Sequence, residues 1–552
     1  MTVVDSAESS VTPAPSPTFE LNLDQPGFSK PMVAALLVVL LTIAVLCRMS
    51  GLGGAVTEDE DQWMARAGNF ASGLLSGDRG RTYQTGHPGV IPMWLITGSL
   101  GVERTAELSS RGRQDFVVTT LPQFLPDLRQ SRIPFLALGA LLCATTAALV
   151  WRLLGTGPGL IAGALLVTDP YWSAMSPVVG MDGLLAGFLA ISLLTLLLAL
   201  SEPGRAIAWL TCSGIAMGLA GLTKSSAAYM VPALIAVALA AGWAPLKRHP
   251  FPHIRHQLRF LAVWLIAAVG IYYALWPAMW TQPFGTLYRA IDFSARLGGT
   301  PHAPGNFLLG STAEDPGPLF YPVAMAFRLG PATTLGLLAL LAFGSSRRLT
   351  KVSWLLLIAA GVFALLLTVS PKKVDRYLMP VAPLLIMLAA IGWWRALEWL
   401  IAQKWLSTAR VSTRGLVAGI AVLAGVFQVW PLVQAGRYPL AAYNPLVGGA
   451  RAAEQAIPVG WGEGLDDTAA IIENMAGGGP VTTSIWFPLR VNFQAHMPGP
   501  VVTERQLSQA DFFVDYIHAR QRLHTPSQLQ RRTPDAIVSI GGVDYARIYK
   551  LR

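Results

Sequence analysis

The chain has 552 residues, of which 53% are hydrophobic and only 13% are charged, whereas about 25% of residues are charged in soluble globular proteins. This composition excludes an ordinary soluble protein and indicates a membrane protein. The net charge of +10 does not indicate a nucleic-acid partner, because the excess Lys and Arg fall in short loops between apolar runs, where they orient a protein in the bilayer.

The chain begins with residues 1–30, which are acidic and rich in Ser and Pro. They lack the basic start and the cleavage site of a secretory signal, so we expect a disordered tail followed by a retained first span. Eleven apolar runs follow, and each approaches the length of about 20 residues that crosses a bilayer. They lie at 31–47, 132–152, 159–175, 178–200, 206–223, 226–243, 260–276, 331–344, 353–370, 379–396 and 415–432.

The loops between these runs predict the orientation of the chain. Under a count of eleven spans, one side receives the basic loops around Arg152 and Arg205 and those at 246–259, 345–351 and 395–414. Basic loops mark the cytoplasmic side of a membrane protein. We therefore expect a multi-pass protein of the cell membrane with its N-terminus in the cytoplasm.

The opposite, external side receives the first external loop at 48–131, a second loop at 277–330 and everything that follows the last span. Residues 433–552 are less apolar than the rest, and "TPDAIVSIGGVDYARIYKL" near the end alternates as a strand does. The predicted fold is thus a mainly α, polytopic helix bundle over residues 31–432 with a small external α/β domain over residues 433–552.

The stretch "TEDEDQWMARAGNF" at 57–70 follows the first span with four acidic side chains in a row. Thr57 and Glu60 form the T-x-x-E pattern of a capping box, and acids in a first helical turn favour the positive end of the helix dipole. Trp63, Ala67, Phe70 and Leu74 then recur at the spacing of an amphipathic helix. Capping leaves Asp59 without a structural role, and a free carboxylate at the mouth of a membrane cavity is a candidate general base.

Several motifs in order resemble the GT-C membrane glycosyltransferases, in particular the protein O-mannosyltransferase and aminoarabinose-transferase group. The first external loop contributes "DEDQWMARAGNFASGLLSGD" and "TYQTGHPGVIPMW", in which Asp59 and Glu60 match the Asp-Glu pair of that group. The motifs "SPVVGMDGLLAGF", "GLTKSSA" and "KKVDRYLMPVAPLL" continue the resemblance, which covers most of residues 31–396.

The resemblance implies transfer of a sugar from a polyprenyl-phosphate carrier to a hydroxyl of a protein, lipid or glycan acceptor at the external face, with inversion. Such chemistry needs a carboxylate to take the acceptor's proton and cations to stabilise the leaving phosphate. Asp59, paired with Glu60, matches the first need. For the second, the chain offers Lys372, Lys373 and Arg376 beside Tyr377, on the side where the orientation rule predicts few cations. Snorkelling at the end of a span is the alternative role of these cations.

Three further residues are candidates for substrate binding. Asp182 lies inside the fourth span, where an acid is costly and usually functional, although pairing with Lys224 or Arg66 would also explain it. Lys224 is either a snorkelling lysine or a contact to the donor. His87, in "TGHPG", is either a turn residue beside a proline or a contact to the acceptor or the sugar.

The expected partners are a polyprenyl-phosphate-sugar donor, a hydroxyl-bearing acceptor and membrane lipids. We expect no cofactor, because no nucleotide-binding glycine loop, zinc pattern or haem motif is present, and a divalent metal is left open. A transporter or flippase of polyprenyl-linked glycans is the alternative function. Transporters, however, tend to have inverted repeats and polar groups at the midplane, whereas the ionisable candidates here lie at the outer ends of spans.

The topology is open to a direct test. A reporter enzyme that is active only in the cytoplasm should be inactive when fused after Arg552 and active when fused before the first span, because an odd number of spans places the two termini on opposite sides. Cytoplasmic activity of the C-terminal fusion would contradict the predicted orientation.

Overall fold

The structure is a computed structural model of the chain. The residues that it describes are 30–53, 55–109, 122–246, 250–301, 305–346, 349–403 and 413–552. The tail predicted at 1–30 therefore lies, apart from its last residue, outside the described residues.

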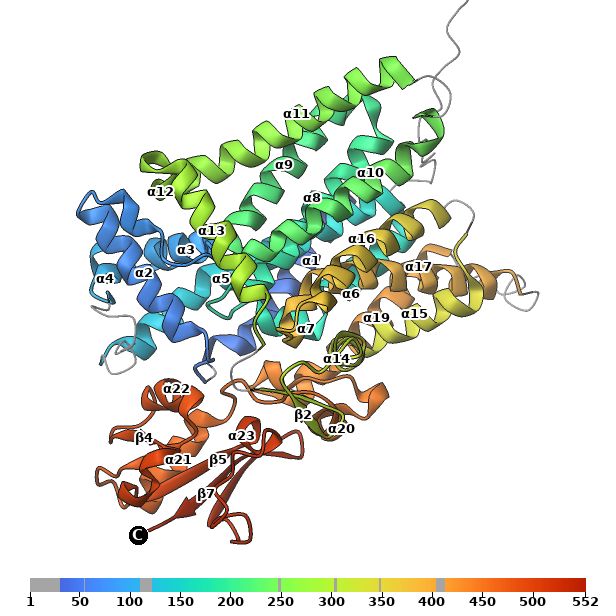
Figure 1. Ribbon diagram of the computed structural model, residues 1–552. Helices are drawn as coiled ribbons and strands as arrows, with labels where there is room; N and C mark the ends of the chain where they lie inside the picture. Colours follow the sequence, from blue (N-terminus) through green and yellow to red (C-terminus); the bar gives the residue numbers. More distant parts are fainter. Residues whose placement is uncertain are drawn as a thin grey trace, which may run out of the picture.

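Long apolar helices form a bundle, and the α/β domain lies at one end of it (Figure 1). Every predicted span overlaps a helix. These helices are α1 (Lys30–Met49), α5 (Phe124–Leu154), α6 (Thr156–Val167), α8 (Asp182–Ser201), α9 (Ala206–Thr223), α10 (Met230–Leu246), α11 (Pro250–Leu275), α15 (Pro331–Phe343), α16 (Thr350–Val369), α17 (Ala382–Ile401) and α19 (Thr413–Ala435). The span predicted at 159–175, however, is divided between α6 and the short helix α7 (Pro170–Met175).

The part of the chain that the structure describes has eight helices long and apolar enough to cross a membrane. A ninth span results if α14 (Phe320–Arg328) and α15, which are bent by 117° at their junction, cross as one. The apolar helices α6 and α10 are shorter. The prediction of a polytopic helix bundle is confirmed, and the count of eleven spans stays a prediction.

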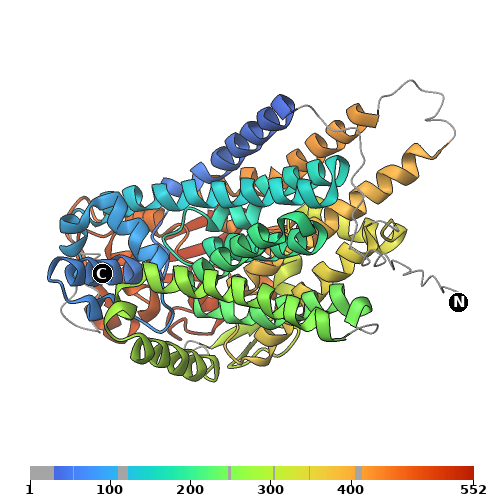
Figure 2. The same ribbon diagram turned by 90° about the horizontal axis from the view of Figure 1, so that it is seen from above.

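The burial of the helices sets the layout of the bundle. α8 is apolar on every face, and 89% of its apolar 18-residue stretch is buried, as expected of a helix surrounded by others. It packs against α5 and α9. In α1 and α11, only 17% and 6% of the corresponding apolar stretch is buried. Seen from above, α1 is the blue helix at the margin of the bundle (Figure 2). The first residue of α8 is thus held at the centre of one end.

Short elements cover that end. The first external loop supplies the predicted amphipathic helix, α2, in which Trp63, Ala67 and Phe70 are buried. The short elements of the segments 48–131 and 277–330 are α2 (Glu60–Leu75), α3 (Val90–Leu100), α4 (Val102–Ala106), α12 (Pro277–Thr281), α13 (Pro283–Gly298), β1 (Asn306–Leu308), β2 (Ser311–Ala313) and α14. The six-residue helix α7 (Pro170–Met175) lies between α6 and α8.

The C-terminal domain is built on a five-stranded sheet of order β4-β3-β5-β7-β6. β3 pairs in parallel with β4 and β5, whereas β7 pairs antiparallel with β5 and β6. Its elements are α20 (Gly449–Ala456), α21 (Leu465–Met475), β3 (Thr483–Ile485), α22 (Arg490–Gln494), β4 (Val501–Thr503), β5 (Phe512–Tyr516), α23 (Ile517–Gln521), β6 (Ala536–Ile540) and β7 (Val543–Lys550).

The strand pattern predicted near the C-terminus is confirmed as the hairpin β6–β7. Its two-residue turn consists of Gly541 and Gly542, both with positive φ angles of 59° and 79°. Two-residue hairpins favour such left-handed turns because their twist matches that of the strands.

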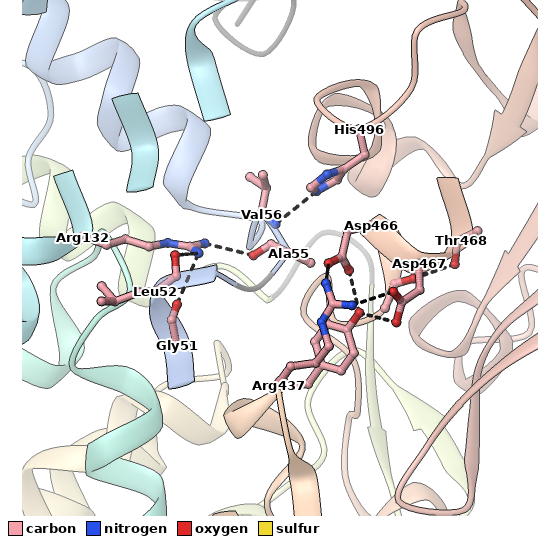
Figure 3. A network of polar contacts seen from close by, with 12 residues as sticks. Gly51, Leu52, Ala55, Val56, Arg132, Arg437, Asp466, Asp467, Thr468 and His496 are labelled. Atoms are coloured by element: carbon pink, nitrogen blue, oxygen red, sulfur yellow. Dashed lines mark hydrogen bonds and ion pairs between the residues drawn. The ribbon is translucent and has the colours of Figure 1, made fainter. Parts of the chain in front are cut away.

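The C-terminal domain is fastened to the first external loop (Figure 3). The Val56 N–H donates to His496 Nε2 at 3.4 Å, and the amide of Asn492 donates to the Thr57 carbonyl at 2.7 Å. Gly462 has a φ of +117°, and a Cβ there would lie 2.3 Å from the Val56 carbonyl oxygen. Only glycine allows so close a backbone approach with this conformation. Both segments therefore lie at the same end of the bundle, as the predicted topology requires.

Candidate active site

Four charged side chains of alternating sign form a row at the domain end of the bundle. Arg376 Nη2 lies 2.8 Å from Asp59 Oδ2, and its Nε lies 3.5 Å from Asp182 Oδ2. Lys224 Nζ donates to the other carboxylate oxygen of Asp182 at 2.6 Å. We call Asp59, Arg376, Asp182 and Lys224 the charged row, and it joins four segments that are far apart in the sequence.

Helix termini place each member of the row. Asp59 is the N-cap of α2 and Asp182 is the first residue of α8, so both acids lie at the positive ends of helix dipoles. Lys224 directly follows the last residue of α9, at the negative end of that dipole. Arg376 lies in the 3₁₀ helix η6 (Asp375–Val381) that leads into α17. The interruptions between helices thus supply the polar backbone that a buried charged site needs.

Aromatic rings flank the two cations of the row. Lys224 Nζ lies 4.1 Å from the centroid of the Tyr377 ring, and the guanidinium carbon of Arg376 lies 4.2 Å from the ring centroid of Trp461. Cations are attracted to the faces of such rings when water is excluded. Trp461 follows the last span, so the C-terminal domain contributes a side chain to the site.

A cavity of about 630 Å³ opens beside the row, between α9, α11 and α13. Its walls are mainly apolar, and they include Met217, Trp264, Val269, Leu287 and Ile291. The polar side chains among its lining residues include His87, Lys224, Ser225, Lys372 and Tyr377. We call this the apolar cavity, and it combines a long apolar wall with a cationic end.

At the cationic end, Lys224 is paired with Asp182 of the charged row, whereas Lys372 makes no ion pair among the described residues. Burial, with further contributions from Lys224 and Arg376, lowers the pKa of Lys372. Burial, followed by Lys224 and Lys372, lowers the pKa of His87 to about 3, so its imidazole is neutral near pH 7. Its Nδ1 lies 2.6 Å from the hydroxyl oxygen of Ser225. A bound anion would relieve this accumulation of positive charge.

A second and smaller pocket, of about 60 Å³, lies between the bundle and the C-terminal domain. We call it the interdomain pocket. Among its lining residues are Glu58, Tyr171, Arg376, Trp461 and Arg522. The segment 372–377 borders both spaces, because some of its residues line this pocket and others line the apolar cavity.

The two adjacent lysines of this segment do not act together. Lys372 lines the apolar cavity, whereas Lys373 lines the interdomain pocket. Lys373 Nζ donates to Asp315 Oδ1 at 2.7 Å and to the Ser370 carbonyl at 2.8 Å. The predicted cluster of three cations is therefore divided between the cavity, the pocket and the charged row.

Glu60 is fully buried in an ion pair with Arg132 of α5. Its Oε1 accepts from Arg132 Nε at 2.9 Å and its Oε2 lies 2.5 Å from Arg132 Nη2. The backbone N–H groups of Thr57 and Val179 donate to the same carboxylate at 2.9 and 3.0 Å. The Glu60 half of the predicted capping box is thus present, but Thr57 Oγ1 has no partner among the described residues. Both oxygens of Glu60 are therefore occupied, and the side chain holds the loop in place. A direct catalytic role, as predicted from the sequence, would need a carboxylate oxygen that is free to contact the substrate.

The structure adds residues to the site that the motifs did not single out. Glu58 and Trp461 line the interdomain pocket, and Arg132 holds Glu60. The sequence signal for Arg132 is its position at the start of the predicted span 132–152, since a charged residue within a span usually has a buried partner. The acids of the row are each paired with a cation, and among the described residues no three His, Cys, Asp or Glu side chains are grouped as metal ligands would be.

Residues 124–273 match the family model described as dolichyl-phosphate-mannose-protein mannosyltransferase. The match covers roughly a quarter of the chain, from α5 to α11, and for that part it confirms the resemblance found in the motifs. No curated protein matches the chain.

Among solved structures, the chain is similar to ArnT from Cupriavidus metallidurans in the apo state, with 14% identity over 94% of this chain and 97% of that one, at a TM-score of 0.49. The same protein bound to undecaprenyl phosphate gives 15% identity over 94% and 98%, at 0.47. The Pmt1–Pmt2 complex of S. cerevisiae bound to the sugar donor gives 18% identity over 47% and 35%, at 0.36.

The ion pair of Glu60 predicts a large loss of stability in Glu60→Gln. Gln has one carbonyl oxygen where Glu60 has two carboxylate oxygens, so it loses one of the two backbone hydrogen bonds. It also leaves the Arg132 guanidinium buried without a counter-charge, which costs about 3–5 kcal/mol. Thermal unfolding of the purified protein in detergent should show a clear drop in Tm. Glu107→Gln, in an exposed pair with Arg104, is the matched control and should shift Tm little. Equal Tm values for Glu60→Gln and wild type would mean that the pair does not hold the loop.

Proposed function

We propose that the protein transfers a sugar from a polyprenyl-phosphate-linked donor to an acceptor hydroxyl at the external face of the membrane. The observation that carries the proposal is the apolar cavity with its cationic end. A polyprenyl phosphate has the complementary shape and charge, because a long hydrocarbon chain carries one anionic head. The family description matched by residues 124–273 names a donor of the same chemical class.

In this proposal the phosphate of the donor lies among Lys372, Lys224 and His87. The leaving group is a phosphodiester that becomes a phosphate monoester, so it needs positive charge rather than an acid. Lys372 and Lys224 supply this charge as point cations, and the neutral imidazole of His87 adds a polar contact. The prenyl chain extends along the wall formed by α9, α11 and α13, where apolar side chains replace water.

The charged row supplies the other half of the reaction. The acceptor oxygen attacks the anomeric carbon, the bond from that carbon to the phosphate oxygen breaks, and the hydroxyl proton passes to a carboxylate on the opposite face of the sugar. We assign Asp59 to this step. The ion pair with Arg376 fixes the direction of its carboxylate, and Asp182 holds Arg376 and Lys224 together, so that base and phosphate-binding cations keep one geometry.

The sugar and the acceptor stay open in this proposal. A hexose such as mannose fits the resemblance, and the acceptor is a protein, a lipid or a glycan with a free hydroxyl. A flippase would leave the bond between sugar and phosphate intact. Release of free polyprenyl phosphate therefore separates the two functions.

The assignment of Asp59 as the general base predicts that Asp59→Asn loses turnover. The purified protein is given a radiolabelled polyprenyl-phosphate-mannose and a membrane extract of the source cells, and the released polyprenyl phosphate is measured. Asn keeps size and polarity but cannot take the proton, so turnover should fall by about 10²–10⁴-fold while Tm changes little. Asp535→Asn, at an exposed site of the C-terminal domain, is the control. Full turnover in Asp59→Asn would place the base elsewhere, and no release by the wild type with a panel of sugar-loaded donors would contradict the function.

Because Lys372 and Lys373 line different spaces, we expect their substitution to affect donor binding differently. Lys372→Ala should raise the half-saturating donor concentration by about tenfold or more, because a charge-assisted contact to the phosphate is lost. Lys373→Ala should leave that concentration within about twofold, since Lys373 faces Asp315 instead. Titration of the donor in the same assay measures both. Equal effects of the two variants would show that the cationic end of the cavity does not bind the phosphate.

A further inference from the structure

The interdomain pocket contains polar groups that the donor chemistry does not use. Tyr171 is 3% exposed, and its hydroxyl has no hydrogen-bond partner among the described residues. The indole N–H of Trp461 is buried and equally without a partner there. The carboxylate of Glu58 makes no ion pair or hydrogen bond within the described part of the chain. Leaving a buried polar group unpaired is costly, so two such groups beside the half-buried carboxylate of Glu58 indicate a ligand.

Three of the four Lys and Arg residues that line the pocket are paired with a carboxylate, and the fourth, Arg522, donates to the carbonyls of Gly305 and His518. Arg328 pairs with Asp375 at 2.8 Å. Lys373 pairs with Asp315, and Arg376 pairs with Asp59. A phosphate or carboxylate ligand would have to compete with these pairs, whereas a neutral ligand leaves them intact. The pocket therefore favours a neutral polar group, in contrast to the cationic end of the apolar cavity.

The free groups match the hydrogen bonds of a hydroxyl. A hydroxyl donates one hydrogen bond and accepts up to two. The Glu58 carboxylate can take the donated bond, while the indole N–H of Trp461 and the hydroxyl of Tyr171 can supply the accepted ones. A volume of about 60 Å³ holds a few water-sized groups of about 10–15 Å³ each. It admits the hydroxylated end of a molecule and excludes a whole lipid or glycan chain.

We propose, on the basis of the proposed function, that the interdomain pocket is the acceptor subsite, in which Glu58, Tyr171 and Trp461 bind the neutral hydroxyl-bearing end of the acceptor. Glu58 directly precedes Asp59, and Arg376 links both the pocket and the charged row. The acceptor hydroxyl is thereby delivered beside the base, on the side away from the donor phosphate. The C-terminal domain closes this subsite through Trp461 and so takes part in choosing the acceptor.

The subsite has a pH signature. Burial, followed by the neighbouring charge of Asp59, raises the pKa of Glu58 to about 7, and Glu463 raises it further, whereas Arg376 and Arg522 lower it. Glu58 is therefore ionised above pH about 7 and protonated below it. Since the ionised carboxylate is the stronger acceptor of a hydrogen bond, acceptor binding should weaken as the pH falls through about 7.

The test compares Glu58→Gln and Trp461→Phe with wild type in the polyprenyl-phosphate release assay, at saturating donor and increasing amounts of the membrane extract as the acceptor pool. Glu58→Gln keeps the size of the side chain but replaces the charged carboxylate by a weaker, neutral acceptor, and Trp461→Phe removes the indole N–H and reduces the size of the ring. Each should raise the half-saturating amount of extract by about tenfold, while the half-saturating donor concentration stays within about twofold. Glu473→Gln and Trp430→Phe, at exposed sites outside the pocket, are the matched controls and should behave as wild type.

The pH profile gives a second readout that a merely structural role would not change. In the wild type, the half-saturating amount of extract should rise as the pH falls below about 7, and in Glu58→Gln it should not. If both variants saturate with extract as the wild type does, or if they change the donor requirement instead, the acceptor subsite is refuted while the proposed function stands. If the wild type releases no polyprenyl phosphate at all, the proposed function fails and this inference fails with it.

Discussion

The buried ion pair between Glu60 and Arg132 is the interaction on which the site depends. The same guanidinium donates to the carbonyls of Gly51, Leu52 and Ala55, and the same carboxylate receives two backbone N–H groups. The pair thereby fixes the backbone between α1 and α2, on which Glu58 and Asp59 are carried. Such a pair adds little net stability but is costly to break on one side, so it sets geometry more than it sets the free energy of unfolding.

The charged row likewise keeps buried charges paired. Asp59, Arg376, Asp182 and Lys224 alternate in sign, so each desolvated charge has an opposite neighbour. The row leaves a surplus of positive charge only at the cationic end of the apolar cavity. On its other side, the interdomain pocket is close to neutral. Two spaces of different charge thus border one segment, residues 372–377, as a reaction between an anionic lipid and a neutral hydroxyl requires.

The sequence predicted the helices of the bundle, the amphipathic helix α2 and the hairpin β6–β7 because each depends on local periodicity. It also indicated all four members of the charged row as candidates, because acids within spans and cations on the predicted external side are rare. It could not separate Lys372 from Lys373, since in extended backbone neighbouring side chains point to opposite sides. Nor could it assign Glu60, whose partner lies 72 residues away, or Trp461, whose contact with Arg376 joins the last domain to the bundle.

The contact between Thr57 and Asn492 has a consequence for the order of assembly. The two residues are 435 positions apart, and ribosomes add about 5–20 residues per second. The first external loop therefore emerges about 20 to 90 s before the segment that covers it is synthesised. During that interval the loop has the Arg132 guanidinium but neither Asn492 nor His496. A nascent chain thus holds an unfinished candidate site, which is completed only when the segment around Asn492 and His496 has been synthesised.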